Sequence, residues 1–598
     1  MKLDQKQSNF TMQKWSLDDL YPSLDQETLQ ASFQKILQQV TAFETLRDSL
    51  QPDMDSHAFL AAIHQLELIY EQNHRLESYA TLKFSENTQD QAVQAMLAQM
   101  DQFSAELSNR IMFFTLWWKK LDEENAQRLL KDAGDVHYWL EELRHFSPFT
   151  LTEPEEQIIN LKDITGVSAQ NTLYDALTNR YQFQLEVDGE KKEFTRGELM
   201  VYAHHFDPNL RTWAYNELYR VYGNDGDILG QMYQTRVRDW YNEEVQLRKF
   251  ATPISARNLA NDIPDEVVDL LLDSCRKNAG VFQQFFKLKA ALLKMDKLRR
   301  HDIYAPVVKA DHKFSYEEGT ALVLQGFAAF DEEITDQAYQ VFQQQHIDSE
   351  VRAGKRDGAF CLTATPSLTP WVLVNYQGKT NDVTTLAHEL GHAVHSLLAA
   401  DHSIFTQHPC LPLAETASTF GEMLIVDELL RSRKDDADFI KDLLFQQVDD
   451  AYATIQRQAY FALFEIEAHK LTLQGASVKD LCEAYMKNLH DQFGDAVVID
   501  EIFKWEWVSI PHIYHVPFYV YAYSFGQLLV LSLYQQYQKE GADFIPRYKR
   551  ILAAGGSKAP MALLRSEGID IADPDFWQGG FDVIQKMVDE LTSMTAKS

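Results

Sequence analysis

The 598-residue chain is poor in cysteine and in basic residues. Its four cysteines, Cys275, Cys361, Cys410 and Cys482, include no C-x-x-C pair, which argues against a disulfide framework or a thiolate zinc site and favours a reducing compartment. Lys and Arg number 56 against 88 Asp and Glu, so the formal net charge is −32. A chain this acidic is not expected to offer a general nucleic-acid or anionic-membrane surface.

Long apolar runs are also missing. The nearest candidate for a membrane span, residues 519–534, is interrupted by Ser524, Gly526 and Gln527 and is therefore predicted to be a core helix. Residues 1–9 carry no apolar core of the kind that a signal peptide has. We therefore expect a cytoplasmic protein that binds neither membranes nor nucleic acid, and the sequence does not predict its oligomeric state.

Residues 382–400 carry the strongest functional signal. Apolar residues recur there at steps of three and four, which predicts an amphipathic helix capped by Asp382. The helix contains an H-E-x-x-H motif at 388–392. Four residues correspond to about 400° of rotation, so His388 and His392 share one face and can bind one Zn²⁺ together. Glu389 points roughly 100° away and can take a proton from the attacking water. The alternative is a core helix with two buried, hydrogen-bonded histidines.

Gly391 lies in the middle of this predicted helix. A glycine there costs about 1 kcal/mol relative to alanine. We expect that another part of the chain approaches the helix backbone closely at this position.

A zinc ion held by two histidines needs a third protein ligand and one open position. The carboxylates within reach along the sequence are Asp401, Glu415, Glu422 and Glu428. Residues 413–424 are predicted to be helical, with Glu415, Ser418, Thr419 and Glu422 on one face. Glu415 is the candidate ligand and Glu422 the candidate hydrogen-bond partner of a ligating histidine. Spacing alone does not choose between the two, and an exposed polar face is the alternative.

Two segments are predicted to be strands. Residues 181–187 alternate between apolar and polar, and Asp188-Gly189 and residues 191–195 follow, which predicts a β-hairpin with a type I′ turn. We place a boundary after this hairpin, between an N-terminal helical region at 1–200 and a catalytic region at 201–598. Residues 359–376 form the second segment, in which Pro370 suits an edge strand or a strand start. Such an edge strand beside a metal-binding helix can bind a substrate backbone by strand addition, and a purely structural hairpin is the alternative.

Residues 511–523 concentrate histidine and tyrosine side chains. Peptide hydrolysis develops an oxyanion that needs hydrogen-bond donors, and neutral imidazole and phenol groups are suitable. An aromatic helix that packs a core, with its hydroxyl groups bonded locally, explains the same composition.

The residues HELGHAVH at 388–395, followed by AETAST at 414–419, resemble the M3 family of zinc peptidases, and within it the oligoendopeptidase F group. The similarity extends to LVNYQ at 373–377, IPHIY at 510–514, FYVY at 518–521 and AAGGSK at 553–558. The resemblance implies that Glu415 is the third ligand. It also implies that His512, Tyr514 and Tyr521 face the substrate, while Tyr519 and His515 stay open as alternatives because residues 515–517 depart from the commoner family pattern.

The residues predict a mainly α fold with a small β element beside the zinc helix. The resemblance implies that two helical halves enclose a deep substrate channel. The predicted activity is zinc-dependent cleavage of internal bonds in short peptides, with Glu389 as general base. Mn²⁺ or Co²⁺ could replace Zn²⁺ in vitro. The alternatives are a zinc exopeptidase of the carboxypeptidase type and a non-catalytic helical protein that binds peptides.

Overall fold

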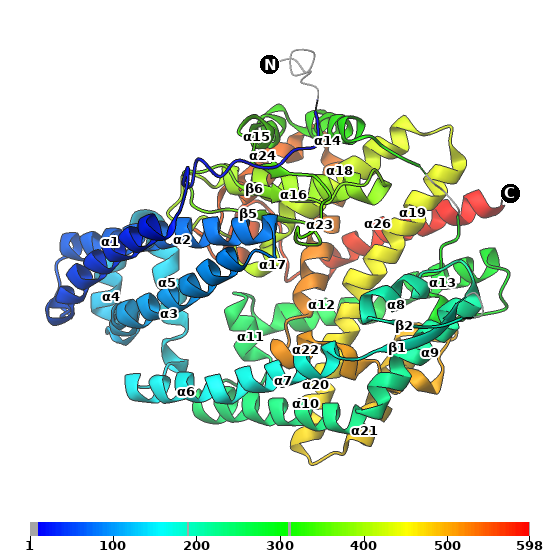
Figure 1. Cartoon of the computed structure of the whole chain (residues 1–598), viewed down its shortest axis with the longest axis horizontal. Coiled ribbons are helices and arrows are strands. Elements are labelled where there is room, and N and C mark those ends of the chain that lie inside the picture. Colours follow the sequence, from blue (N-terminus) through cyan, green and yellow to red (C-terminus); the bar gives the residue numbers. More distant parts are fainter. Residues whose placement is uncertain (1–9, 188–189, 309–311, 597–598) are drawn as a thin grey trace. The chain divides into compact units, whose positions relative to one another are not determined.

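The computed structural model describes residues 10–187, 190–308 and 312–596, and these are mainly helical (Figure 1). The predicted mainly α fold class is therefore confirmed. The chain divides into two compact units, each assembled from segments that are far apart in the sequence. Unit 1 comprises Met1–Ser147, Asp311–Lys434 and Gln536–Ile569, and unit 2 comprises Pro148–Ala310, Asp435–Gln535 and Asp570–Ser598. The predicted boundary near residue 200 and the predicted substrate channel stay predictions.

Unit 1 begins with helices whose apolar faces form one core. They are α1 (Gln26–Glu44), α2 (Ser56–Glu86), α3 (Gln91–Lys120), α4 (Glu123–Leu130) and α5 (His137–His145), with 3₁₀ turns at Thr45–Ser49, Gly134–Val136 and Ser147–Phe149. Asp25, Asp55, Asp90 and Asp122 each precede a helix and accept a backbone N–H of its first turn at 2.8 to 3.0 Å. Each such cap typically stabilises a helix by about 1 kcal/mol.

The rest of unit 1 surrounds the helix that carries the H-E-x-x-H motif. Its elements are α14 (Tyr316–Phe330), α15 (Glu332–Gln343), β4 (Ile347–Asp348), β5 (Phe360–Leu362), β6 (Trp371–Leu373), α16 (Thr380–Leu398), α17 (Leu411–Ala414), α18 (Thr416–Ser432), a 3₁₀ turn (Gly541–Phe544), α24 (Ile545–Ala553) and α25 (Pro560–Ser566). Helix α16 contacts α14, α15, α18, α24, β5 and β6, so the motif helix is central to this unit (Figure 1).

The sheet beside α16 has the strand order β4-β6-β5. β6 pairs with β4 in parallel and with β5 antiparallel, and its residues Trp371 to Leu373 are fully buried. The predicted strand start at Pro370 is confirmed, because Pro370 directly precedes β6, whereas the other option, an edge strand at this position, is wrong because β6 is the central strand. Strand order depends on contacts distant in sequence, which local composition does not report. The edge strand beside α16 is β5.

Helix α16 begins two residues before the predicted cap. Asp382 is its third residue, and Asp382 Oδ2 accepts the backbone N–H groups of Gln377 at 2.8 Å and Lys379 at 2.9 Å. The carboxylate thus bonds the backbone just before the helix, in the first turn, where negative charge is favourable.

Unit 2 is also mainly helical. Its first part contains α6 (Glu153–Thr165), α7 (Val167–Asn179), β1 (Phe183–Val187), β2 (Glu190–Phe194), α8 (Arg196–Ala203), α9 (Pro208–Asn224), α10 (Gly226–Trp240), a π-helix (Tyr241–Leu247), α11 (Ser255–Ala260), α12 (Asp265–Lys277), α13 (Ala279–Leu292), β3 (Leu298–Arg299) and a 3₁₀ turn (Arg300–Asp302). β1 and β2 form the predicted antiparallel hairpin, whose turn at 188–189 lies outside the described residues.

The second part of unit 2 carries the histidine and tyrosine segment. It contains α19 (Ala437–Ala451), a π-helix (Tyr452–Gln456), α20 (Arg457–Leu473), α21 (Val478–Phe493), β7 (Val497–Val498), 3₁₀ turns (Glu501–Trp505 and Trp507–Ser509), α22 (His512–His515), α23 (Tyr521–Glu540) and α26 (Pro574–Ala596). β3 and β7 pair in parallel. Helix α23 continues past Gln535 into the segment assigned to unit 1.

Candidate metal centre and its surroundings

The two histidines of the motif lie one turn apart on α16. The apolar positions Val383, Leu386 and Leu390 are fully buried, which leaves the histidine face of the helix partly open. The rings of His388 and His392 are 4.9 Å apart between centroids, and each side chain is about a quarter exposed (26% and 25%). Two imidazoles on one helix face are therefore available to the same ion.

Glu415 completes a group of three donor atoms. It lies between α17 and α18, and its Oε2 atom is 3.3 Å from His388 Nε2 and 3.4 Å from His392 Nε2. Ligand atoms bound at about 2.0–2.1 Å to one tetrahedral ion are about 3.3–3.4 Å apart. The donor set thus fits a zinc ion, and within the part of the chain that the structure describes it is the one group of three such residues close enough to hold a metal.

The polar stripe predicted on residues 415–422 faces α16. Ser418 and Thr419 are buried, and Ser418 Oγ donates a hydrogen bond to Glu415 Oε2 at 2.8 Å. Glu422 Oε1 accepts a hydrogen bond from His388 Nδ1. This bond places the proton of a neutral His388 on Nδ1 and leaves the Nε2 lone pair directed at Glu415. The alternative of an exposed polar face is therefore wrong for these residues.

The close packing of α16 on α18 explains Gly391. A Cβ atom at this position would lie 2.6 Å from Ala417 O and 2.6 Å from Ser418 Cα. The predicted close approach to the helix backbone is confirmed. Because Glu415 directly precedes this part of α18, the glycine also sets how near Glu415 comes to the two histidines.

The charges of the site favour a cation. Burial lowers the pKa of His388, but hydrogen bonds to Glu415 and Glu422 outweigh burial and raise this pKa well above its ordinary value. Burial raises the pKa of Glu415, but hydrogen bonds from His388 and His392 outweigh it and hold this pKa below its usual range. Two carboxylates beside two imidazoles therefore form a site that attracts positive charge.

Glu389 lies next to the ligand group and is only 6% exposed. Burial raises its pKa above the ordinary value, while the imidazoles of His388 and His392 oppose that rise. The Cys361 thiol of β5 also has a raised pKa, first because of burial and second because of the charge of Glu389. The edge strand and the candidate base are thus neighbours.

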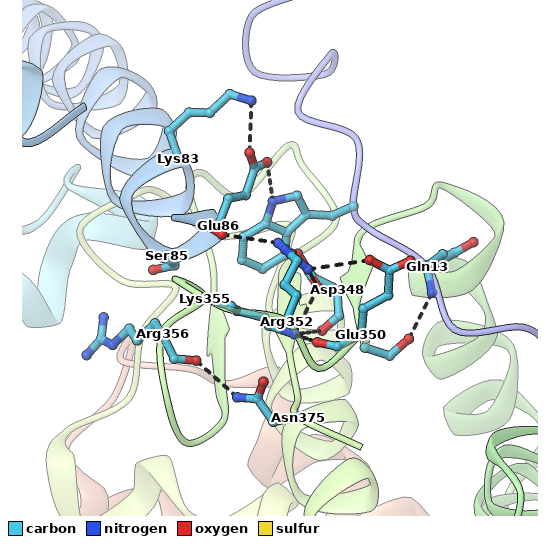
Figure 2. Close-up of polar contacts among 12 residues, drawn as sticks. Gln13, Lys83, Ser85, Glu86, Asp348, Glu350, Arg352, Lys355, Arg356 and Asn375 are labelled. Atoms are coloured by element: carbon cyan, nitrogen blue, oxygen red, sulfur yellow. Dashed lines mark hydrogen bonds and ion pairs between the residues drawn. The ribbon is translucent and has the colours of Figure 1, made fainter. Parts of the chain in front are cut away.

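The loop that leads into β5 is held by a fully buried lysine (Figure 2). Lys355 Nζ donates to the backbone carbonyls of Asp348 at 3.1 Å, Glu350 at 2.7 Å and Val374 at 2.8 Å. It also lies 2.9 Å from Asp348 Oδ1. Buried ammonium groups need this degree of pairing, so the loop conformation is strongly specified.

Asn375 holds the same loop at the residues directly before β5. Its side-chain amide donates to Arg356 O at 3.0 Å and to Gly358 O at 2.9 Å, and Figure 2 shows the first of these bonds. The backbone directly before the edge strand β5 is therefore held by a side chain that follows β6.

An extended N-terminal segment crosses this loop (Figure 2). The backbone N–H of Gln13 donates to Ser349 Oγ at 3.1 Å, and the backbone carbonyl of Gln13 accepts from the Ser349 N–H at 2.9 Å. Trp15 Nε1 donates to Glu86 Oε1 at 2.8 Å, and Lys83 lies 3.0 Å from the other oxygen of Glu86. The segment thus ties the end of α2 to the loop between β4 and β5.

The predicted oxyanion donors differ in exposure. His512 is exposed, whereas Tyr514 and Tyr521 are 2% and 0% exposed. The Tyr514 hydroxyl donates to Leu229 O at 3.3 Å, and the Tyr521 hydroxyl accepts from Asn261 Nδ2 at 2.8 Å. The two tyrosines thus sit in the core of unit 2, and the catalytic roles of all three residues stay predictions.

The partly exposed aromatic neighbours of His512 are Tyr519 and Tyr523. The rings of His512 and Tyr519 are parallel within 6° at 6.1 Å, and those of Tyr519 and Tyr523 are 5.2 Å apart. Tyr523 belongs to the predicted histidine and tyrosine segment, but it was not among the residues expected to face the substrate. The remaining alternative, His515, lies 3.1 Å from Asp175 Oδ1.

The model of the family described as Peptidase family M3 matches residues 201–583, and the model described as Oligopeptidase F matches residues 117–183. The first match covers well over half of the chain. The chain belongs to peptidase family M3.

Relatives of this M3 peptidase carry oligopeptidase names. Oligopeptidase PepF of Bacillus subtilis is 26% identical over 594 residues, which cover 98% of this chain and 87% of the relative. Group B oligopeptidase PepB of Streptococcus agalactiae is 26% identical over 567 residues, which cover 91% of each. Together with the family match, these names confirm the predicted kinship with oligoendopeptidase F and the predicted enzyme class, a metallo-endopeptidase.

Solved structures share the fold of this M3 peptidase. A crystal structure of oligoendopeptidase-F from Enterococcus faecium has a TM-score of 0.73 at 21% identity and covers 96% of this chain and 100% of its own. A candidate peptidase from Chlamydophila abortus has a TM-score of 0.85 at 24% identity and covers 97% and 98%. Among the described residues of this M3 peptidase, no helix is both long enough and apolar enough to cross a membrane.

Proposed function

We propose that this M3 peptidase is a zinc-dependent endopeptidase of the cytoplasm that hydrolyses internal bonds of short, unstructured oligopeptides. The observation that carries the proposal is the spacing of His388 Nε2, His392 Nε2 and Glu415 Oε2, with the buried carboxyl of Glu389 beside them. Three donors at tetrahedral spacing leave one position open for water or substrate, which is the arrangement of catalytic and not of structural zinc sites.

His388, His392 and Glu415 would hold the ion, with Glu422 orienting His388. A zinc ion bound there would polarise the scissile carbonyl and lower the pKa of a bound water towards about 7. The set of two imidazoles and one carboxylate also accepts Mn²⁺ or Co²⁺, so these ions could support activity in vitro.

Glu389 is the proposed general base. It takes a proton from the attacking water as the water oxygen bonds to the carbonyl carbon, and it passes that proton to the amine nitrogen as the C–N bond breaks. Its burial and its raised pKa support the role of proton acceptor, because a carboxylate with a raised pKa binds a proton more tightly than an exposed one.

The edge strand β5 is proposed to pair with the substrate backbone. It is the free edge of the sheet beside α16, and its neighbour Glu389 is the candidate base. Pairing through main-chain groups suits an enzyme that accepts many sequences in extended form. A folded protein does not present an isolated extended strand, which fits a preference for short peptides.

His512 is proposed to donate a hydrogen bond to the oxyanion. Although the residue is open to solvent on one side, desolvation of the ring by its neighbours lowers the pKa of His512, which favours the neutral ring that can donate one N–H. Tyr514 and Tyr521, predicted as donors with it, have buried hydroxyl groups bonded to Leu229 O and Asn261. That burial favours a supporting role for the two tyrosines. Tyr519 is therefore proposed, in their place, as the second donor to the oxyanion together with His512.

The test is mass spectrometry of a mixed pool of short peptides after incubation with the enzyme and with a metal-stripped sample. The proposal expects internal cuts that depend on metal, with folded proteins left intact. Products that differ from the substrate by one or two residues at the C-terminus would instead establish the exopeptidase alternative. An absence of cleavage in the metal-loaded sample would favour a non-catalytic peptide-binding protein.

A further inference from the structure

The turn between α22 and α23 contains a strained residue. Phe518 has φ of +58°, a left-handed conformation that is unfavourable for a non-glycine residue, and its side chain is only 1% exposed. Such a conformation persists only where the surroundings enforce it. The residue after it is Tyr519, so the turn decides where the Tyr519 ring lies.

Three ionisable side chains from three different helices bond the backbone of α22 and of the turn that follows it. Arg236 of α10 donates from Nε to Tyr514 O at 3.2 Å. Arg257 of α11 donates from Nε to Pro517 O at 3.2 Å. Glu465 of α20 accepts the Phe518 N–H on Oε1 at 3.0 Å. All of these groups belong to unit 2.

The two arginine side chains are themselves held in place. The indole of Trp240 lies under both guanidinium groups, 5.4 Å from Arg236 and 5.9 Å from Arg257. Arg236 also pairs with Asp239 at 3.1 Å, and Trp240 Nε1 donates to Pro253 O at 2.8 Å. Cation–π contacts of this kind restrict the arginine side chains without using their remaining donors.

Glu465 is fully buried. Burial raises its pKa to about 8, against the hydrogen bond from Phe518 and the charge of Arg257, which lower it. A buried carboxyl is costly unless it is neutral or well paired, so an apolar side chain would fill this space at lower cost. Glu465 accepts a backbone hydrogen bond from Phe518, the residue with the strained conformation.

We propose that Glu465, Arg236 and Arg257 are positioning residues, which fix the backbone of residues 514–518 and thereby hold Tyr519 beside His512. The parallel rings of Tyr519 and His512 are the geometry that this clamp maintains. Hydrogen-bond donors must be preorganised to stabilise an oxyanion, and a misplacement of about 1 Å can cost about 10²-fold in rate. The inference rests on the proposed role of His512 and Tyr519.

The experiment compares three variants with the wild type. Glu465→Gln keeps a carbonyl oxygen for the Phe518 N–H, whereas Glu465→Leu removes it at similar volume. Glu467→Leu is the matched control, because Glu467 is an exposed residue of the same helix. The measurements are kcat and KM on one peptide, metal content, and amide hydrogen exchange of a proteolytic peptide covering residues 512–523.

A change in kcat and in hydrogen exchange is expected for Glu465→Leu alone among the three variants. Its kcat falls by about 10- to 100-fold while KM changes by less than about threefold, because the clamp acts on a group used in the transition state. Exchange in the 512–523 peptide becomes faster, and metal content is unchanged. Glu465→Gln and Glu467→Leu behave as the wild type.

The proposal is overturned if Glu465→Leu keeps its kcat, or if its 512–523 peptide exchanges as slowly as that of the wild type. A fall in kcat that Glu467→Leu shares would also overturn it, since the effect would then be general to α20. His512→Ala separates this failure from that of the proposed function. Unchanged activity in His512→Ala removes the donor role itself, whatever the exchange rates of the Glu465 variants are.

Discussion

Glu422 accepts a hydrogen bond from His388 Nδ1, across the contact between α18 and α16. The bond fixes both the tautomer and the ring orientation of a candidate ligand, and outer-shell partners of this type typically change metal affinity by about 10- to 100-fold. Glu422→Ala is therefore expected to bind zinc about 10- to 100-fold more weakly, measured by competition with a chelator.

Glu428→Ala is the control for that change. Glu428 lies on the same helix, is also largely buried, and pairs with Arg431 instead of a histidine. Its zinc affinity should equal that of the wild type. Equal weakening in both variants would assign the effect to the stability of α18 and not to the orientation of His388.

Gly391→Ala should lower both stability and metal content. Alanine in a helix interior normally stabilises by about 1 kcal/mol relative to glycine. Here the added Cβ would meet Ala417 O and Ser418 Cα at 2.6 Å, so α18 must move and the expected loss is about 1–3 kcal/mol. Thermal unfolding and metal analysis measure the two effects.

A matched glycine exists in α13. Gly280 has no heavy atom within 4 Å of the position where a Cβ would lie. Gly280→Ala should therefore unfold at the wild-type temperature or slightly above it. Unchanged stability and metal content in Gly391→Ala would contradict the close packing of α16 on α18.

Asn375→Ala should weaken substrate binding without removing metal. The variant loses the two hydrogen bonds to Arg356 O and Gly358 O, so the backbone before β5 becomes less ordered. If β5 pairs with the substrate, KM rises by several-fold, in keeping with about 0.5–1.5 kcal/mol for each lost bond. Steady-state kinetics on one peptide measure the change.

Gln377→Ala serves as the control, because Gln377 is exposed and lies two residues from Asn375. Its KM should match that of the wild type. If Asn375→Ala also leaves KM unchanged, substrate pairing with β5 is contradicted.

Glu465 is expected to make stability depend on pH. Its pKa is raised by burial from an ordinary value of 4.5 to about 8, so the folded state binds the proton more tightly than the unfolded state does. The contribution is fully present below about pH 4.5 and is lost as the pH rises through about 8.

Glu465→Gln is permanently neutral and lacks this dependence. The difference in unfolding temperature between Glu465→Gln and the wild type should therefore grow in favour of the variant as the pH rises from about 5 to about 9. A constant difference across that window would show that the carboxyl does not titrate there.

The sequence predicted the ligand helix well, because the relevant information is local. A helical period, a four-residue histidine spacing and an unfavourable mid-helix glycine are all properties of residues 382–400, and α16 carries them as expected. The place of Glu415 beside the histidines depends on how α18 packs on α16. Spacing therefore left both Glu415 and Glu422 open, and the family resemblance supplied the choice.

Local patterns failed where the answer depends on distant contacts. Nothing within residues 359–376 shows that β4 pairs with β6, so the sequence left open whether Pro370 belongs to an edge strand or begins a strand, and it did not show that the edge strand is β5. In the aromatic segment every helix face carries large rings, so periodicity does not separate buried Tyr514 and Tyr521 from partly exposed Tyr519. The strained Phe518 has no composition signal, because side chains of other helices impose its conformation.

The most direct test of the account is the activity of Glu389→Gln, with metal content measured on the same sample. The substitution keeps the shape of the side chain and removes only its ability to take a proton. We expect full metal occupancy with kcat reduced by at least about 10³-fold, the combined scale of general-base catalysis and water activation. Full occupancy with kcat within about tenfold of the wild type would contradict the assignment of Glu389 as the base.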